Sequence, residues 1–195
     1  MNDKIVWITG ASSGIGEATA LRFAKEGWKV AVSARRVELL NKLAENENIY
    51  SYPLDITDTI KIKEVFESII KDLGKIDLCI FSSGTYERKS EKEISVENIK
   101  QVIDVNFLGV INSVSSVEKY FKENKSGHIA IVSSPVGYRG LPKSSGYTPS
   151  KAALNNFTQG IYFDFQKFNV RITLITPGFI TVSYTHLTLP TSDLV

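Results

Sequence analysis

Short apolar runs rich in β-branched residues alternate with longer amphipathic stretches along this chain of 195 residues. Strands separated by helix-length segments pair in parallel, so this order predicts a doubly wound α/β fold, with one parallel sheet and helices on both faces. The strands are apolar throughout, which is typical of parallel strands buried on both sides. We expect strands at residues 5–9, 29–33, 49–54, 76–81, 128–133 and 170–176. We expect helices at residues 14–26, 36–45, 58–72, 95–123 and 147–167.

Composition argues against several kinds of partner. The 23 Lys and Arg residues nearly balance the 21 Asp and Glu residues, so the net charge of +2 gives no reason to expect nucleic acid or an anionic membrane as a partner. No apolar run approaches the roughly 20 residues that span a bilayer. Cys79, the single cysteine, lies in an apolar strand and is expected to be a buried thiol. His128 and His186 lack clustered ligand neighbours, so we expect no metal site and predict a soluble cytoplasmic protein.

A glycine-rich turn, with the sequence Thr-Gly-Ala-Ser-Ser-Gly-Ile-Gly, joins the first expected strand to the first expected helix. Glycines at such a turn let the backbone approach a pyrophosphate, and the helix N-terminus offers free N–H groups to the phosphates. The spacing Gly-x-x-x-Gly-x-Gly differs from the usual Gly-x-Gly-x-x-Gly, and an ordinary strand–turn–helix connection is the alternative. Its place after the first strand favours cofactor binding, and we assign to it Gly10, Ser12, Ser13, Gly14, Ile15 and Gly16.

Tyr147 and Lys151 are four residues apart in an expected helix, which puts both side chains on one face. A free phenol has a pKa of about 10 and is a poor base at neutral pH, but a neighbouring ammonium favours the phenolate. Pro149 fits between them only in the first helical turn, where its missing N–H costs no hydrogen bond. Ser134, 13 residues before Tyr147, offers a hydroxyl for a substrate oxygen. The pair alone would equally fit an amphipathic helix with a half-buried Tyr and a solvated Lys.

Taken in order, these segments resemble the short-chain dehydrogenase/reductase family over about residues 4–180. The resemblance implies a Rossmann-type three-layer α/β/α domain that binds NAD(P)(H) and acts as an oxidoreductase. In that family pattern, Tyr147 would be the general acid/base, Lys151 would assist it and contact the nicotinamide ribose, and Ser134 would orient the substrate. Asn106, in Val105-Asn106-Phe107-Leu108-Gly109, would hold a water that links Lys151 to solvent. A buried structural Asn106 is the alternative.

Three further segments match the family pattern in part. Asp55 and Ile56, after the third strand, resemble its adenine-contacting pair, although Asp55 could equally cap a strand end. The segment Phe-Ser-Ser-Gly at 81–84 stands where the family has Asn-Asn-Ala-Gly, so only Gly84 is carried over as a cofactor residue. After the sixth strand, the resemblance implies nicotinamide contacts from Pro177, Gly178 and Ile180.

The end of the second strand bears on cofactor choice. An acidic residue there would bind the ribose 2′-hydroxyl, whereas an arginine accommodates a 2′-phosphate. Ala34 stands where the acidic residue would be, and Arg35 and Arg36 follow it. Since Arg pairs with phosphate in a bidentate manner, NADP(H) is favoured over NAD(H). The alternative is that both arginines are solvated charges at a helix start.

Residues 182–195 do not continue the family pattern. They show no helical period, and no lid, further helix or last strand is recognisable. The letters from Val182 to Thr191 resemble the translation of a sequencing adapter. We therefore predict an incomplete domain at residues 1–181, lacking its last strand and substrate lid, followed by a non-native tail at 182–195. A divergent short C-terminus is the alternative, and resequencing across the junction decides between them.

These observations predict an oxidoreductase that transfers a hydride between NADP(H) and a small carbonyl or alcohol substrate, with Tyr147 as general acid/base. Two alternatives remain at this stage: a nucleotide-sensing protein of the same fold without turnover, and a fragment that binds cofactor but catalyses nothing. The resemblance also implies a homo-oligomeric parent that associates through the long helices at 95–123 and 147–167.

Overall fold

A single parallel sheet forms the centre of the molecule. The computed structural model describes residues 4–86 and 94–178, and within them six strands pair in the order β3-β2-β1-β4-β5-β6. The strands are β1 (Ile5–Thr9), β2 (Lys29–Ser33), β3 (Ile49–Ser51), β4 (Leu78–Phe81), β5 (Gly127–Val132) and β6 (Val170–Ile175). The predicted doubly wound α/β fold is therefore confirmed. The predicted lack of a last strand and a substrate lid concerns residues after β6 that lie outside the described ranges.

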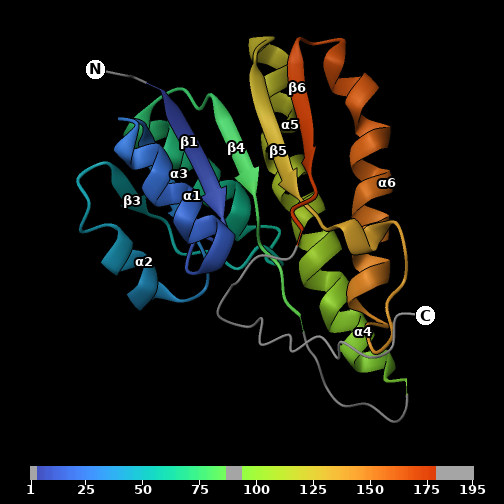
Figure 1. Ribbon diagram of the computed structural model, residues 1–195. Helices are drawn as coiled ribbons and strands as arrows, with labels where there is room; N and C mark the ends of the chain where they lie inside the picture. The colour runs from blue at the N-terminus through green and yellow to red at the C-terminus, as the bar shows by residue number, and fades with distance from the viewer. Residues whose placement is uncertain (1–3, 87–93, 179–195) are drawn as a thin grey trace.

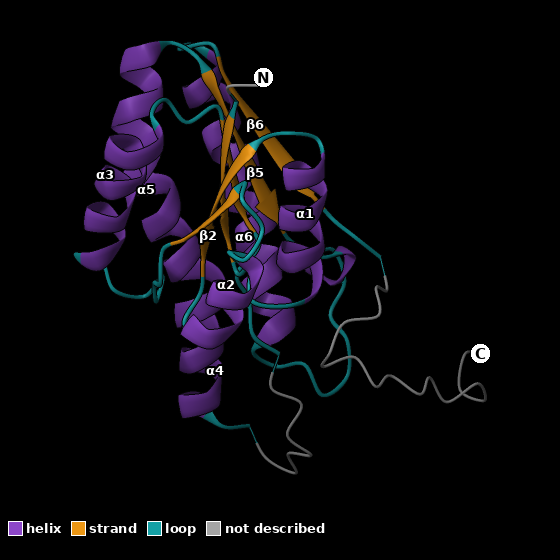
Figure 2. Cartoon of the chain, turned by 90° about the vertical axis from the view of Figure 1, so that its left-hand side faces the viewer, coloured by secondary structure: helices purple, strands orange, loops and turns teal. Residues whose placement is uncertain are grey.

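Helices cover both faces of this sheet (Figures 1 and 2). On one face, α1 (Gly14–Lys25) and α2 (Val37–Leu43) pack on the sheet through Ala20, Ala24 and Leu40. On the other face lie α3 (Lys61–Leu73), α5 (Gly109–Asn124) and α6 (Tyr147–Gln166). Strand residues alternate between the two cores, as the period of two along a strand requires. Among the described residues, no helix is long and apolar enough to cross a membrane.

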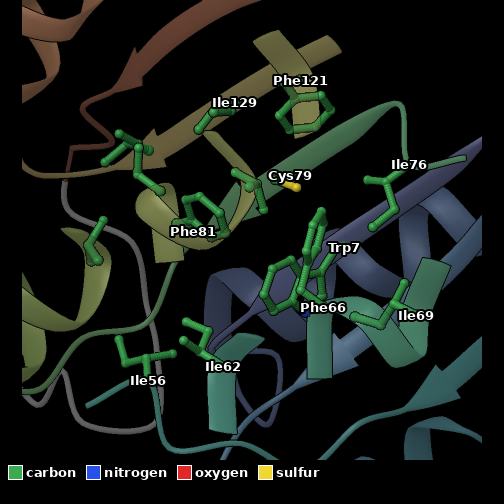
Figure 3. Packing of buried hydrophobic residues seen from close by; sticks show 14 of the residues in the cluster. Trp7, Ile56, Ile62, Phe66, Ile69, Ile76, Cys79, Phe81, Phe121 and Ile129 are labelled. Carbon is green, nitrogen blue, oxygen red and sulfur yellow. The ribbon is translucent and has the colours of Figure 1, made fainter. Parts of the chain in front are cut away.

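The larger core is built around Trp7 (Figure 3). Its ring stacks on Phe66 of α3 with centroids 5.9 Å apart and meets Phe81 of β4 edge-on at 5.8 Å. The indole Nε1 donates a 2.9 Å hydrogen bond to Ser33 Oγ, so this buried donor is satisfied. Cys79 is fully buried beside this cluster, as predicted, and burial raises the pKa of its thiol.

Two element boundaries differ from the prediction by three residues. β3 ends at Ser51 rather than at residue 54. The backbone N–H groups of Tyr52 and Leu54 nevertheless bond to β2 and its extension, at 2.9 and 3.0 Å. α3 begins at Lys61 rather than residue 58, because Asp58 Oδ1 accepts the N–H groups of Ile60 and Lys61 in a turn that precedes the helix.

The long helix expected at 95–123 is interrupted. α4 (Val96–Ile103) leads into a π-helical turn (Asp104–Leu108) and then into α5. Within this turn, the N–H of Gly109 donates to the carbonyl of Asp104, five residues earlier. Such turns widen a helix locally and are frequent at functional sites. The extra residue brings Asn106 into the interior, where it is completely buried.

The last described helix begins where the Tyr-x-x-x-Lys pattern requires. α6 starts at Tyr147, so Pro149 occupies the first turn, as the sequence predicts. A short 3₁₀ turn (Pro135–Gly137) and a loop separate α6 from the end of β5. Ser134 at the end of β5 and Tyr147 at the start of α6 are thereby brought to the same edge of the sheet.

Candidate active site

A cavity of about 500 Å³ runs along the edge of the sheet at which the strands end. The arrowheads of β1, β4, β5 and β6 all point to this edge in Figure 1. The strand order reverses between β1 and β4, and in open α/β sheets ligands bind at such a switch point. One end of the cavity is lined by Arg35, Arg36 and Asp55, and the other by Ser134, Tyr147 and Lys151.

The glycine-rich turn at the middle of the cavity has no room for larger residues. Gly10 has a φ of +72°, and a Cβ there would lie 2.7 Å from the backbone of Ser83. A Cβ on Gly16 would collide with the carbonyl oxygen of Gly10, so α1 can pack this close to the turn only with glycine. Ser82 completes the contact, because its Oγ donates to the carbonyl of Thr9 at 2.8 Å. The small side chains of Ser82 and Ser83 therefore fit where the loop after β4 packs against the glycine-rich turn.

The N-terminus of α1 opens onto the same cavity. Its N-cap, Ser13, forms no side-chain hydrogen bond to the first turn. Gly14, Ile15 and Gly16 line the cavity at this point. The first N–H groups of a helix lack partners within the helix and carry the positive end of its dipole. This end of α1 is therefore suited to hold a phosphate group.

An arginine from the loop after β2 lies against the turn. Arg36 donates from Nη2 to Ser12 Oγ at 2.8 Å and to Ser13 Oγ at 2.6 Å. Arg35 also lines the cavity, and both arginines are exposed. Across the cavity, Asp55 Oδ1 accepts from the N–H and the hydroxyl of Thr57, at 3.0 and 2.8 Å. Asp55 thus caps its own turn while it lines the cavity, and its contact with an adenine stays a prediction.

Ile56, next to Asp55, anchors the adjacent loop to the start of α5. Its side chain is buried and occupies the space that a Cβ on Gly109 would need. Its carbonyl accepts a 3.1 Å hydrogen bond from Asn112 Nδ2 on α5. This part of the cavity wall is therefore fixed to α5, which directly follows the π turn that carries Asn106.

Asn106 connects three segments through its side-chain amide. Oδ1 accepts the N–H of Thr85 at 2.7 Å, and Nδ2 donates to the carbonyl of Thr85 at 2.9 Å. The second Nδ2 hydrogen goes to Ser150 Oγ at 3.2 Å. These bonds hold the loop after β4 against α6. Gly84 lies next to these groups, since a Cβ there would be 3.5 Å from Asn106 Oδ1 and 3.8 Å from Lys151 Nζ.

Lys151 is a buried cation. Only 4% of the residue is exposed, and its Nζ donates to the carbonyl of Val132 at 3.2 Å. Burial lowers the pKa of this amine from 10.5 to about 8. Nζ also lies 5.8 Å from the centre of the Tyr147 ring. The structure thus brings the predicted acid/base pair together at one end of the cavity.

The two serines at the end of β5 have different environments. Ser133 is buried, and its Oγ donates to Asn155 Oδ1 at 2.5 Å, which ties β5 to α6. Ser134 is only partly buried, and its Oγ accepts the N–H of Val136 at 3.4 Å. A hydroxyl that accepts from one backbone group still has its own proton to donate. The spacing that favours Ser134 over Ser133 agrees with this arrangement.

Comparison with known proteins identifies the chain. A sequence model of the family described as short chain dehydrogenase matches residues 4–191. The chain belongs to this family of oxidoreductases. The match extends past the boundary that the sequence predicts at residue 181, and that boundary lies outside the described residues.

Individual relatives agree with this assignment. The chain is 33% identical to dehydrogenase/reductase SDR family member 7 from mouse and human, over 91% of this chain and 56% of those proteins. It is 35% identical to the 3-oxoacyl-(acyl-carrier-protein) reductase FabG of Thermotoga maritima, over 95% of this chain and 78% of that protein. The chain therefore spans between about half and about four fifths of the length of these curated relatives.

Solved structures of the family share the fold. The structure of ElxO with NADP bound superposes with a TM-score of 0.87 at 28% identity, covering 92% of this chain and 75% of that one. Of the site residues predicted from sequence, all but two line the cavity. Asn106 lies behind the cavity wall, and Ile180 falls outside the described residues.

Tyr86 and Ser144 also line the cavity, and no sequence motif predicts them. Tyr86 lines the cavity, and its ring meets that of Tyr147 edge-on with centroids 4.8 Å apart. The Tyr86 hydroxyl lies 3.2 Å from Ser144 Oγ, on the loop before α6. The only available signal was an aromatic residue two positions after Gly84, and nothing in the sequence placed it beside Tyr147. Among the described residues, no group of three or more His, Cys, Asp or Glu is arranged to hold a metal ion.

Proposed function

We propose that this short-chain dehydrogenase transfers a hydride between NADP(H) and a carbonyl or alcohol carbon, with Tyr147 as the general acid/base. The observation that carries the proposal is the position of the buried Lys151 ammonium beside the Tyr147 ring, at one end of a cavity whose middle is a glycine-rich helix start. The cavity therefore combines a phosphate-binding segment with a proton-transfer pair, as the reaction requires.

The residues present fit a nicotinamide dinucleotide. The uncapped N-terminus of α1 offers donors for the pyrophosphate, and the close packing of Gly16 on Gly10 brings backbone within reach of it. Asp55 and Ile56 would border the adenine, and Gly84, Pro177 and Gly178 would border the nicotinamide half. When bound, the cofactor supplies or accepts the hydride, and the protein supplies position and electrostatics.

The protein's own residues manage the proton. Tyr147 would donate its phenolic proton to a carbonyl oxygen or take one from an alcohol. The Lys151 cation would stabilise the phenolate form, because an opposite charge favours the ionised state of its neighbour. Ser134 would donate its hydroxyl hydrogen to the same substrate oxygen and so fix the oxygen near Tyr147.

Asn106 would act as a positioning residue in this scheme. Both hydrogens of Nδ2 and one acceptor site of Oδ1 are used by Thr85 and Ser150. A relay water on this side chain would have only the second acceptor site of Oδ1 available. These contacts favour a role in holding Gly84 and Thr85 beside Lys151.

Three observations support NADP(H) over NAD(H). The second strand is followed by Ala34 rather than an acidic residue, and by two cavity-lining arginines. Arg36 has two hydroxyl partners, which hold its guanidinium at the phosphate-binding turn. The relative ElxO has been solved with NADP bound. The guanidinium groups would pair with the 2′-phosphate that distinguishes NADP(H).

We also propose that the protein associates with a second copy through α5 and α6. Phe163 is 66% exposed and Tyr162 41% exposed on α6, while Leu108 just before α5 is 45% exposed. Exposed large apolar side chains on these two helices are suited to an interaction surface. Sedimentation of the wild type and of Phe163→Glu tests this proposal. A dimer that the charge does not weaken would contradict it.

The proposed reaction is tested by titration and turnover with one protein preparation. NADPH and NADH are titrated separately, and the oxidation of NADPH is then followed with a panel of aldehydes and ketones. Tighter binding of NADPH, with turnover of at least one carbonyl compound, is the expected result. Failure of both nucleotides to bind would refute the proposal.

A further inference from the structure

The Tyr86 side chain closes one side of the cavity at its reacting end. It follows β4, yet its hydroxyl lies 3.2 Å from Ser144 Oγ on the loop before α6. Ser144 is itself fixed, because it is buried and its carbonyl accepts the N–H and the hydroxyl of Thr148, at 3.1 and 2.9 Å. Tyr86 therefore joins two loops that are 58 residues apart in sequence.

The ring of Tyr86 is equally constrained. It meets Tyr147 at an interplanar angle of 87° with centroids 4.8 Å apart, a geometry that aromatic pairs favour. Lys151 Nζ lies 5.8 Å from the centre of the same Tyr147 ring. The phenol of Tyr147 is thus held by an aromatic ring as well as by the helix that carries it. A molecule bound beside the Tyr147 hydroxyl would also lie beside Tyr86.

Apolar side chains line part of this end of the cavity. Val105, Val136 and Leu141 line it together with Tyr86. Among the described lining residues, charged side chains occur only at Arg35, Arg36, Asp55 and Lys151, and the first three lie at the opposite end. Lys151 is buried, and Arg139 and Lys143 of the neighbouring loop are exposed and do not line the cavity. Within residues 4–86 and 94–178, a substrate carboxylate would therefore find no accessible cation at this end of the cavity.

We infer that Tyr86 is a specificity-determining residue, whose ring forms an aromatic wall that selects carbonyl compounds with neutral, apolar substituents, aryl groups above all. The inference rests on the proposed function, since it names the substrate class of that site. Burying a carboxylate without a partner is costly, whereas an aryl ring gains both apolar burial and an aromatic contact. Aryl aldehydes and ketones should accordingly be preferred over short oxo acids.

The test compares two unreactive probes, benzamide and oxamate, titrated calorimetrically with and without NADPH. Benzamide should bind at least about tenfold more tightly than oxamate. Tyr86→Ala should lower the affinity for benzamide by about tenfold, as expected for loss of one good aromatic contact. Tyr86→Phe keeps the ring and should retain the benzamide affinity. Ser144→Ala removes the partner of the Tyr86 hydroxyl and should likewise retain the benzamide affinity. Tyr86→Leu, which keeps apolar bulk without a ring, serves if Tyr86→Ala does not fold, and should weaken benzamide severalfold.

Turnover of benzaldehyde and glyoxylate with NADPH gives a second readout. The ratio of their kcat/KM values should fall about tenfold in Tyr86→Ala and stay near the wild-type value in Tyr86→Phe. A merely structural role would reduce both substrates equally and leave this ratio unchanged, and that result would overturn the inference. Oxamate binding as tightly as benzamide would overturn it as well. Absence of turnover with intact benzamide selectivity would count against the proposed reaction alone, because binding is measured separately.

Discussion

The ammonium of Lys151 lies 5.8 Å from the centre of the Tyr147 ring, at a position where the lysine is 4% exposed. A buried cation is costly, and the Lys151 Nζ donates a hydrogen bond to the carbonyl of Val132 at 3.2 Å. The fold therefore keeps a destabilising group beside the phenol that the proposed chemistry uses. Perturbed groups of this kind gather at functional sites.

The cost of burying Lys151 predicts a pH dependence of stability. Its pKa is about 8 in the folded protein against an ordinary value of 10.5. Below about pH 8 both states hold the proton, and the folded state carries the full cost of the buried charge. Between about 8 and 10.5 the folded state loses its proton while the unfolded state keeps it, so the free energy of unfolding rises with pH. A shift of this size corresponds to roughly 3 kcal/mol.

Chemical denaturation of the wild type and of Lys151→Met, measured between pH 7 and 10.5, checks this expectation. The methionine variant should be the more stable protein at pH 7, and the two should converge as the pH rises. Cys79 and Tyr52 have raised pKa values and act in the opposite direction, but they are common to both proteins and cancel in the difference. A difference that does not change with pH would contradict the buried-cation account.

Replacing both arginines after β2 should change cofactor choice. Arg35→Ala/Arg36→Ala should lower the affinity for NADPH by at least about tenfold, because a charge-assisted phosphate contact is worth about 1.5–3 kcal/mol. The affinity for NADH should stay nearly unchanged. Lys42→Ala is the matched control, since Lys42 is an exposed cation of α2 that does not line the cavity. Equal losses for the two nucleotides would show that the arginines do not recognise the 2′-phosphate.

Two glycines offer a matched pair for testing the phosphate turn. Gly16→Ala places a methyl group against the Gly10 carbonyl and should destabilise the fold by about 1–3 kcal/mol while weakening both nucleotides. Gly160→Ala, on α6, meets no atom within 4 Å and should stabilise the protein by about 0.5–1 kcal/mol. Thermal unfolding and NADPH titration distinguish the two. A Gly16→Ala protein with normal stability and binding would contradict the packing described for α1.

Substitution of Asn106 should lower both stability and turnover, although this side chain does not line the cavity. Asn106→Ala leaves the N–H and carbonyl of Thr85 without their partner and should cost about 1–3 kcal/mol. It should also lower kcat by loosening Gly84 beside Lys151. Asn112→Ala removes a single 3.1 Å bond to Ile56 and serves as the comparison. Equal effects of the two substitutions would argue against a positioning role for Asn106.

The alternating pattern of the chain was sufficient to predict the sheet. All six strands lie where apolar runs indicated them, because a parallel strand buried on both faces leaves a continuous signal. Residues with a motif of their own, such as Gly10, Ser134 and Lys151, also line the predicted site. Pro149 was informative as well, since a proline is tolerated in the first turn and so restricted where α6 could begin.

Features that depend on tertiary contacts could not be predicted. The π turn arises where Asn106 bonds to Thr85 and Ser150, and neither partner is near it in sequence. The Tyr86–Tyr147 contact likewise joins a loop to a helix 61 residues later. The start of α3 was misplaced because Asp58 bonds backbone N–H groups locally, which competes with a helical pattern.

The central claim is that Tyr147 carries the proton, and one substitution tests it most directly. Tyr147→Phe removes only the phenolic hydroxyl, so turnover should be lost while NADPH binding stays within about twofold, since general acid/base catalysis contributes at least about a hundredfold. Tyr138→Phe is the matched control, because Tyr138 is 65% exposed and does not line the cavity. Single-turnover oxidation of NADPH by a reducible aldehyde is the measurement. The account predicts normal rates for Tyr138→Phe and no detectable rate for Tyr147→Phe, and undiminished reduction by Tyr147→Phe would contradict it.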